Sequence, residues 1–253
     1  MPAPEWLTAR PIAHRGLHDA SAGRIENTPS AVAAAAGRGY AIEVDLQETS
    51  DHGALVFHDN TLDRLTGETG PVRARALADL MQIPMRDGGD SLWDLDALLG
   101  LVAGRVPLVI ELKSLNARDG QRAFVKDVTE RLARYDGPVA LKTFDPEMLA
   151  NIRALAPQIP RGILAENTRT DEWRRHFGLM ERFILRHMMH WPRTRPDFIS
   201  YGVRSLPAPV PWLMRRLFRV PVMTWTVRTA EDRAIAARHA DQIVFEGFDP
   251  DRL

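Results

Sequence analysis

The chain has 253 residues, of which 45% are hydrophobic and 26% are charged, a composition typical of a globular protein with a substantial core. Its 33 Lys and Arg residues balance 33 Asp and Glu residues, and a net charge of zero argues against non-specific nucleic-acid binding. Cysteine is absent, which excludes disulfide scaffolds, zinc–thiolate sites, iron–sulfur clusters and cysteine nucleophiles.

Short apolar segments alternate along the chain with helical segments rich in Ala, Leu and Arg, the pattern of an α/β fold. Strands are predicted for Pro11–His14, Ala41–Leu46, Ala54–Phe57, Pro107–Leu112, Val139–Thr143, Arg161–Leu164, Asp197–Tyr201, Val222–Val227 and Gln242–Glu246. Helices are predicted for Pro29–Gly37, Leu92–Val102, Gln121–Tyr135, Pro146–Leu155 and Ala230–His239.

The second and third predicted strands are too close in sequence to be parallel. A short turn-like segment separates Leu46 from Ala54, whereas a parallel crossover needs a dozen or more residues. The strand that begins at Ala54 is therefore expected to run back antiparallel as a hairpin. The eight other strands predict a (β/α)8 TIM barrel. We expect one catalytic domain over residues 1–253, with residues 59–90 as a small insertion after the second strand and its hairpin.

Two predicted strands end in pairs of charged side chains. Because side chains alternate along a strand, Glu43 and Asp45 share one face of the first, and Glu111 and Lys113 share one face of the second. Active sites of (β/α)8 barrels form at this carboxyl end of the strands. Three converging carboxylates would repel one another unless a divalent cation lay between them. The alternative is that these carboxylates lie on a solvated face of a half-buried sheet. This alternative explains one charged pair well, but it explains less well two pairs at equivalent strand ends.

Histidines follow two other strand ends. His14 and Arg15 end the first predicted strand, and His58 follows the return strand. Two imidazoles near neutral pH could serve as general acid and general base. Arg15 can form a forked contact to phosphate oxygens, and Lys113 can add a point charge. A structural role is the alternative for a single histidine at a strand end, but the pair favours catalysis.

These segments resemble the glycerophosphodiester phosphodiesterase family in order and spacing. The motifs are His14-Arg15-Gly16, Glu26-Asn27-Thr28, Glu43-Val44-Asp45, the run from Val56 to Gly67, and Glu111-Leu112-Lys113, with weaker similarity at Thr143-Phe144 and Trp225-Thr226-Val227. The similarity is dense from His14 to Lys113 and thin from Pro146 to Arg219. The sequence departs from the family at Glu246, where an aspartate is common, and at Lys142, where a small polar residue is more usual.

The resemblance implies a (β/α)8 barrel that hydrolyses glycerophosphodiesters to glycerol 3-phosphate and an alcohol, usually with Ca²⁺ or Mg²⁺, in lipid or glycerol metabolism. By position, the implied metal ligands are Glu43, Asp45 and Glu111. The implied acid–base pair is His14 and His58. The implied phosphate- and substrate-binding residues are Arg15, Lys113, Asn27, which supports the site, and Trp225, which could stack on the alcohol portion.

Several alternatives remain open at the level of the sequence. Either histidine could be the acid, and the nucleophile could be water or a neighbouring substrate hydroxyl that first forms a cyclic phosphate. Lys142 is either a second phosphate contact or a solvated lysine, the latter favoured because lysines are mostly surface residues. The same barrel could act on a lipid phosphodiester, like a phospholipase C or D or a lysophospholipid-specific enzyme. A third interpretation is a non-catalytic binding protein that keeps the barrel. The three carboxylates argue against it, because a protein without catalysis would have no need to hold them together.

The expected partner is a small-molecule phosphodiester. No stretch of about 18 apolar residues predicts a membrane span. The first sixteen residues lack a basic start followed by an apolar segment, so a cytoplasmic protein is expected. The segment Pro211–Arg219 is short, basic and amphipathic. It could contact an anionic membrane surface, but we favour a barrel helix with its apolar face on the strands.

Overall fold

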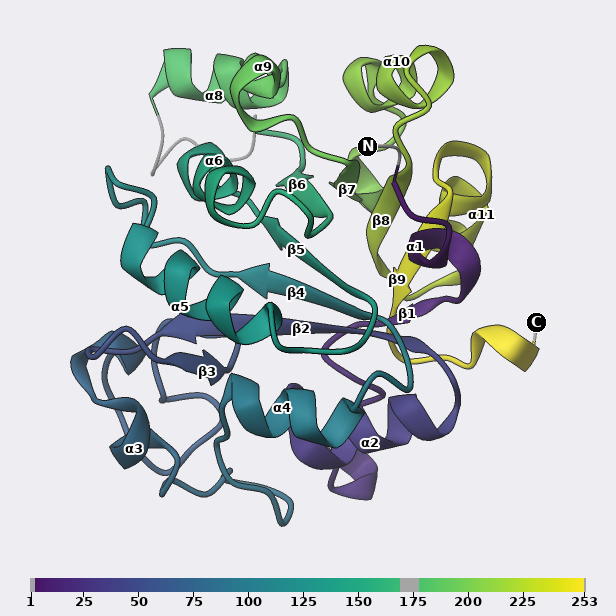
Figure 1. The fold of residues 1–253 in the computed structure, drawn as a ribbon. Coiled ribbons are helices and arrows are strands. Elements are labelled where there is room, and N and C mark those ends of the chain that lie inside the picture. Colours follow the sequence, from purple (N-terminus) through teal and green to yellow (C-terminus); the bar gives the residue numbers. More distant parts are fainter. Residues whose placement is uncertain (1–2, 169–177, 253) are drawn as a thin grey trace.

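The computed structural model describes residues 3–168 and 178–252 (Figure 1). Among these residues, parallel strands close into a barrel, because β1 (Ile12–Ala13) pairs with both β2 (Ala41–Glu48) and β9 (Gln242–Phe245). The strands between them, in order around the barrel, are β4 (Leu108–Leu112), β5 (Val139–Thr143), β6 (Arg161–Ala165), β7 (Phe198–Gly202) and β8 (Val222–Val227). The predicted (β/α)8 TIM barrel is confirmed.

The remaining strand, β3 (Ala54–Val56), lies outside the parallel barrel. It pairs antiparallel with the end of β2, with Val56 opposite Leu46. The turn between the two strands is too short for any other arrangement. The predicted hairpin is therefore confirmed, and it returns the chain towards the barrel mouth at His58.

Helices cover the outside of the barrel (Figure 1). The longer ones are α2 (Pro29–Gly37), α4 (Leu95–Val102), α5 (Arg122–Leu132), α6 (Pro146–Leu155), α8 (Leu179–Arg186), α10 (Pro209–Leu217) and α11 (Ala230–His239). The single-turn helices are α1 (Trp6–Ala9), α3 (Leu77–Leu80) and α9 (Trp191–Thr194), with 3-10 turns at Ala20–Ala22, Val72–Ala74, Val203–Ser205 and Pro250–Arg252. No helix in the described ranges is long and apolar enough to cross a bilayer.

The predicted bounds of α2, α6 and α11 agree with the structure, whereas α4 begins later than the expected Leu92. Its start is decided by Asp94, whose side chain accepts a hydrogen bond from the backbone N–H of Ala97 at 2.9 Å. A capping aspartate satisfies one of the N–H groups that the first turn leaves unpaired. The helix therefore starts where its cap lies, not where the apolar sequence pattern begins.

The barrel interior changes from apolar to charged along its axis. One apolar cluster includes Leu7 of α1 and fills the amino end with Ile12, Ala41, Val109, Ala140, Phe198, Met223 and Val244. Two residues further along β2, β4 and β5, the inward positions are Glu43, Glu111 and Lys142. The outward side chains of the same strands, such as Ile42, join the larger core beneath the helices. Strand alternation thus places the charged residues inside the mouth.

The chain between β3 and α4 packs around a small hydrophobic cluster of its own. That cluster is formed by Ile25, Leu55, Phe57, Leu62, Val72, Leu80, Ile83, Met85 and Leu92. Trp93 joins this segment to the barrel, since its indole N–H donates to the carbonyl of Asn27 at 2.7 Å. The segment therefore stands beside the mouth, where its charged residues can reach the site.

Gly16 allows the chain to turn sharply after β1. Its φ is +79°, and a Cβ built there would lie 2.8 Å from the backbone carbonyl carbon of Ala31 in α2. We expect Gly16→Ala to lower the free energy of unfolding by about 2 kcal/mol or more, measured by urea denaturation, because side chains are strained at this φ and no space is available.

Gly37→Ala is the matched control for this prediction. Gly37 lies within α2, and a Cβ there meets nothing within 4 Å. This substitution should leave stability unchanged or raise it by about 0.5–1 kcal/mol, because alanine is the better helix former. A Gly16→Ala protein as stable as the wild type would contradict the proposed constraint on the turn.

Candidate active site

Three carboxylates meet inside the carboxyl end of the barrel. Glu43 and Asp45 point inward from β2, and the parallel register places Glu111 of β4 beside Asp45. Oxygens of the three side chains all lie within 4.8 Å of one another, and all three residues are buried. Buried carboxylates at this spacing are stable only when cations or hydrogen-bond donors offset their charge.

Two lysines lie directly against these carboxylates. Lys113 Nζ is 2.9 Å from Asp45 Oδ1 and 2.7 Å from Glu111 Oε1. Lys142 Nζ is 2.9 Å from Glu43 Oε1 and 3.9 Å from Glu111 Oε2. Each lysine therefore bridges a pair of carboxylates, and together the lysines tie β2 and β4 to β5.

The expectation that Lys142 is solvated is wrong, because only 2% of its side chain is exposed. Its position on β5 is level with Glu111 on β4. Alternation places Ala140 and Lys142 inward, so the ammonium group has no path to bulk solvent except through the mouth. The general preference of lysines for the surface is overridden here by attraction to Glu43 and Glu111.

Arg15 supplies a third positive charge at the mouth. Its backbone N–H donates to Glu43 Oε2 at 3.1 Å, and its guanidinium Nε lies 3.5 Å from Asp45 Oδ2. Nη1 donates to Glu26 Oε1 at 2.6 Å. The buried Nε has no hydrogen-bond acceptor among the described residues, so one donor of the guanidinium remains available beside the carboxylates.

Asn27 positions Asp45 through two hydrogen bonds. Its Nδ2 donates to Asp45 Oδ2 at 2.9 Å, and its Oδ1 accepts from the Asp45 backbone N–H at 3.2 Å. Burial alone would raise the pKa of the Asp45 carboxyl, but Lys113, His58 and Arg15, together with Asn27, hold it well below its usual range. Asp45 is therefore an anion at any pH near neutrality.

Glu43 is held ionised in a similar way. Burial and the neighbouring Asp45 raise the pKa of its carboxyl, whereas Lys142 and His14 lower it, and the net direction is below the ordinary value. Lys142 is the largest of the lowering influences. Without this lysine, Glu43 would be a buried carboxylate with much weaker compensation.

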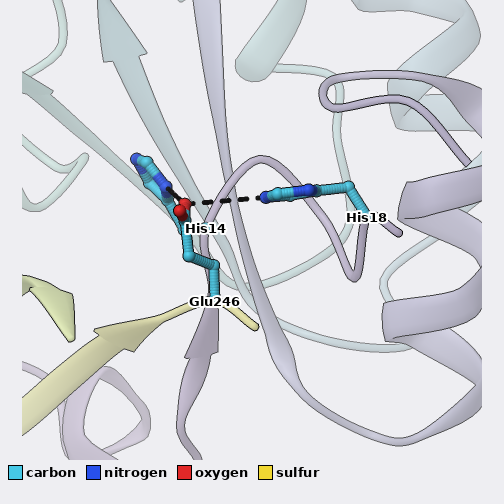
Figure 2. Close-up of side chains that lie close together, drawn as sticks. All are labelled: His14, His18 and Glu246. Atoms are coloured by element: carbon cyan, nitrogen blue, oxygen red, sulfur yellow. Dashed lines mark hydrogen bonds and ion pairs between the residues drawn. The ribbon is translucent and has the colours of Figure 1, made fainter. Parts of the chain in front are cut away.

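Figure 2 shows how His14 lies against Glu246, with His18 on the other side of the same carboxylate. His14 Nδ1 is 2.5 Å from Glu246 Oε2, and His18 Nε2 is 3.6 Å from that oxygen. The second nitrogen of His14, Nε2, faces the carboxylate cluster at 4.0 Å from Glu43 Oε2. A carboxylate on Nδ1 fixes the ring orientation and leaves Nε2 for chemistry.

Glu246 is a site residue that the sequence did not assign to the site. The pairing of the first and last strands could have revealed it. Ala13 lies opposite Phe245, so the residues that follow them, His14 and Glu246, lie at the same level of the barrel. Burial raises the pKa of Glu246, but hydrogen bonds from His14 and Arg228, with His18 nearby, outweigh it and keep the pKa well below its usual range.

His58 joins the site through a chain of charged groups. Its Nδ1 lies 2.8 Å from Asp59 Oδ1, and Arg64 Nε donates to Asp59 Oδ2 at 2.6 Å. Arg64 Nη2 also donates to Glu26 Oε1 at 2.7 Å, the oxygen that Arg15 contacts. Glu26, Asp59 and Arg64 were not assigned roles from the sequence, and they connect the segment after β3 to the mouth.

Trp225 lies on β8 and forms an apolar wall of the mouth. Its ring packs edge-to-face on Phe144, with centroids 5.6 Å apart. Its indole N–H donates to the carbonyl of Ser200 on β7 at 3.2 Å. Because β8 and β5 are not neighbours in the barrel, this aromatic pair bridges separate strands at the carboxyl end.

The donor set of Glu43, Asp45 and Glu111 fits a hard divalent cation. All donors are oxygens, and a cation with ligands at about 2.3–2.6 Å can touch oxygens up to about 5 Å apart. In the described residues, two other groups have similar spacing, His14–His18–Glu246 and Glu26–His58–Asp59. Each of these groups includes one or two histidines, whereas hard divalent cations prefer oxygen ligands, so the three-carboxylate cluster suits such a cation better.

Comparison with known proteins gives a consistent result. A sequence model of the glycerophosphoryl diester phosphodiesterase family matches residues 14–247. The chain is 29% identical over 185 residues to a glycerophosphodiester phosphodiesterase of Caldanaerobacter subterraneus, covering 69% of this chain and 73% of that protein. It is 48% identical over 61 residues to human glycerophosphodiester phosphodiesterase 1, covering 23% of this chain and 17% of that protein.

Solved structures share the fold at lower sequence identity. A phosphodiesterase of Oleispira antarctica, in complex with the product sn-glycerol-3-phosphate, is 18% identical with a TM-score of 0.74, covering 93% of this chain and 92% of that one. A glycerophosphodiester phosphodiesterase of Thermotoga maritima is 20% identical with a TM-score of 0.68, covering 92% of both chains. These similarities establish the barrel fold.

Lys142→Met should lower the free energy of unfolding by about 3–5 kcal/mol in metal-free buffer, because removing one partner of a buried ion pair leaves the other charge uncompensated. Lys126→Met is the control, since that lysine is 58% exposed and pairs with Glu130 on the surface of α5, where such pairs contribute about 0–1 kcal/mol. Urea denaturation measures both. Equal small effects would show that Lys142 does not stabilise Glu43.

The depressed pKa of Glu246 predicts an acid-dependent loss of stability. The ionised Glu246 contributes its full stabilisation at pH values above the pKa of glutamate in the unfolded chain, about 4.3. This contribution is lost as the pH falls towards the lower pKa of the folded state. Glu246→Gln should therefore flatten the decline in unfolding free energy between about pH 5 and pH 3. Glu231 lies on the exposed first turn of α11. The unfolding free energy of the Glu231→Gln protein should therefore decline with falling pH as that of the wild type does. Identical pH profiles for all three proteins would contradict the assignment.

Proposed function

The chain belongs to the glycerophosphoryl diester phosphodiesterase family and is a phosphoric diester hydrolase, and we propose that it releases glycerol 3-phosphate by metal-dependent acid–base catalysis with two histidines. The observation that carries this proposal is the meeting of His14, Arg15 and the buried carboxylates Glu43, Asp45 and Glu111 at one barrel mouth. The related Oleispira antarctica enzyme is described with the same product.

Glu43, Asp45 and Glu111 would hold a Ca²⁺ or Mg²⁺ ion. When bound, such an ion supplies positive charge that polarises the phosphoryl group and stabilises charge in the transition state. The proposal is supported by the all-oxygen donor set and by the depressed pKa values of Glu43 and Asp45, which keep both ligands deprotonated.

Arg15 and Lys113 would contact the non-bridging oxygens of the phosphodiester. The buried Arg15 Nε lacks an acceptor in the described part of the chain, and a phosphate oxygen would satisfy it. Lys113 holds Asp45 and Glu111 together, and its charge lies at the same mouth. Donors placed in advance of the reaction stabilise developing negative charge without reorganisation.

His14 and His58 would move the protons. Each has its Nδ1 on a carboxylate, Glu246 for His14 and Asp59 for His58, so each Nε2 is the nitrogen that exchanges a proton with the substrate. One imidazole takes the proton of the nucleophile and the other protonates the leaving alkoxide. Glu246 and Asp59 hold the two rings in this orientation.

Trp225 would form the wall against the alcohol portion, together with Phe144. We also infer that residues 1–253 act as a single catalytic domain in which residues 59–90 are an insertion. Support for this comes from Asp59 and Arg64, which reach from that segment into the His58 network. An insertion that carries site contacts would fold and act with the barrel.

The test is release of glycerol 3-phosphate from glycerophosphocholine and glycerophosphoethanolamine, with Ca²⁺, with Mg²⁺ and with a chelator. We expect release that depends on a divalent cation and stops with the chelator. His14→Ala and His58→Ala should each lower kcat by at least about 10²-fold, because general acid–base catalysis by one side chain contributes about 10²–10⁴-fold.

His52→Ala serves as the control, because His52 is 61% exposed in the turn between β2 and β3 and pairs only with Glu48 in the described residues. It should turn over substrate like the wild type. Near-normal kcat for a folded His14→Ala or His58→Ala protein would remove that residue from the mechanism. Equal release with cation and with chelator would contradict the metal-dependent part of the proposal.

A further inference from the structure

Large apolar side chains are exposed in one region of the molecule. Among the residues that the structure describes, every exposed large hydrophobic side chain lies between residues 179 and 218. They are Leu179, Met180, Phe183, Met189, Trp212, Leu213, Leu217 and Phe218, with exposed fractions from 40% to 81%. We call the faces of α8 and α10 that carry them, with Met189 and Phe218, the outer helix surface.

The helices α8 and α10 lie at the same end of the molecule, along the upper edge of Figure 1. A groove of about 210 Å³ is lined by the end of α8, at Arg186 and His187, and by the start of α10, at Pro209 and Val210. The groove also reaches Asn167, which follows β6. The groove thus lies between α8 and α10 on the outside of the barrel, and α10 continues from it to the amino end of β8.

The expectation that Pro211–Arg219 packs its apolar face on the strands holds only for part of α10. Val210 and Met214 pack against the barrel core. Trp212 and Leu217 are more than half exposed, and Phe218 beyond the helix end is exposed as well. The helix thus has apolar side chains on two faces, and the barrel covers only one of them.

The same region carries an excess of positive charge. Residues 178–219 contain eight arginines and only two acidic residues, Glu181 and Asp197, giving a net charge of +6 in a chain whose total is zero. Arg215 pairs with Asp241 and Arg193 with Glu147. Arg216 and Arg219 are exposed and have no ion pair within the described ranges.

We propose that the outer helix surface docks this enzyme on an anionic lipid bilayer. Exposed Trp, Phe and Leu side chains beside arginines on short amphipathic helices are suited to the boundary between headgroups and acyl chains. Anionic headgroups complement the exposed Arg216 and Arg219, and each arginine near such a surface adds about fivefold to partitioning. Pairing of this face with a second copy would instead bring two surfaces of the same charge together.

α10 runs from the carboxyl end of β7 to the amino end of β8, and Arg215 near its end pairs with Asp241, which directly precedes β9. Docking through the end of α10 would therefore leave the mouth open to water-soluble substrate. Binding itself goes beyond the proposed function, since it needs only the outer helix surface and no residue of the mouth.

The experiment is sedimentation of the full chain with vesicles of phosphatidylcholine alone and of phosphatidylcholine mixed with phosphatidylglycerol. We expect binding to the mixed vesicles that weakens as salt is added. Arg216→Ala with Arg219→Ala should weaken partitioning by about 25-fold, the effect of two arginines at about fivefold each. Trp212→Ser with Phe218→Ser should also reduce it, because the inserted apolar area is lost.

Arg118→Ala with Arg134→Ala is the matched control, since both arginines are exposed and lie outside the outer helix surface. This pair should bind vesicles as the wild type does. All these variants should hydrolyse water-soluble glycerophosphocholine at the wild-type rate, so loss of docking is distinguished from failure of the proposed function.

Three outcomes would overturn the proposal. One is the absence of binding to the mixed vesicles at low salt. Another is wild-type binding by the Arg216→Ala, Arg219→Ala protein. The third is self-association of the wild type that the Trp212→Ser, Phe218→Ser substitutions abolish, which would assign the surface to a second copy of the chain.

Discussion

Burial of three carboxylates in one barrel mouth is the constraint on which the rest of the site depends. Glu43, Asp45 and Glu111 converge because adjacent parallel strands present their inward side chains at the same level. Ionised groups removed from water need partners of opposite charge. Lys113 and Lys142 supply these partners from β4 and β5. The fold therefore brings the charges together and offsets them with the same set of strands.

The charge balance also explains how the histidines are oriented. Each imidazole contacts a carboxylate outside the central cluster. Glu246 contacts His14, and Asp59 contacts His58. Asp59 directly follows His58 in the sequence, whereas Glu246 reaches His14 because β1 closes the barrel against β9. Closure of the barrel thus creates the contact between His14 and Glu246.

The charged site and the exposed apolar side chains lie in different parts of the molecule. The inside of the mouth holds paired charges that are shielded from solvent, whereas the outer helix surface exposes apolar side chains and unpaired arginines among the described residues. The two regions use different strands, because the carboxylates lie on β2 and β4 whereas α8 and α10 follow β6 and β7. Substitutions on the outer surface can therefore be made without disturbing the carboxylate cluster.

The sequence by itself determined the strands, most helices, the hairpin and the barrel, because periodicity, spacing and turn chemistry are local properties. Alternation along single strands likewise placed Glu43, Asp45 and Glu111 on inward faces. Only the tertiary structure decided the burial of Lys142, the contact of Glu246 with His14 and the exposed face of α10. Each of these depends on which strands become neighbours and which side of a helix is covered, and no local pattern carries that information.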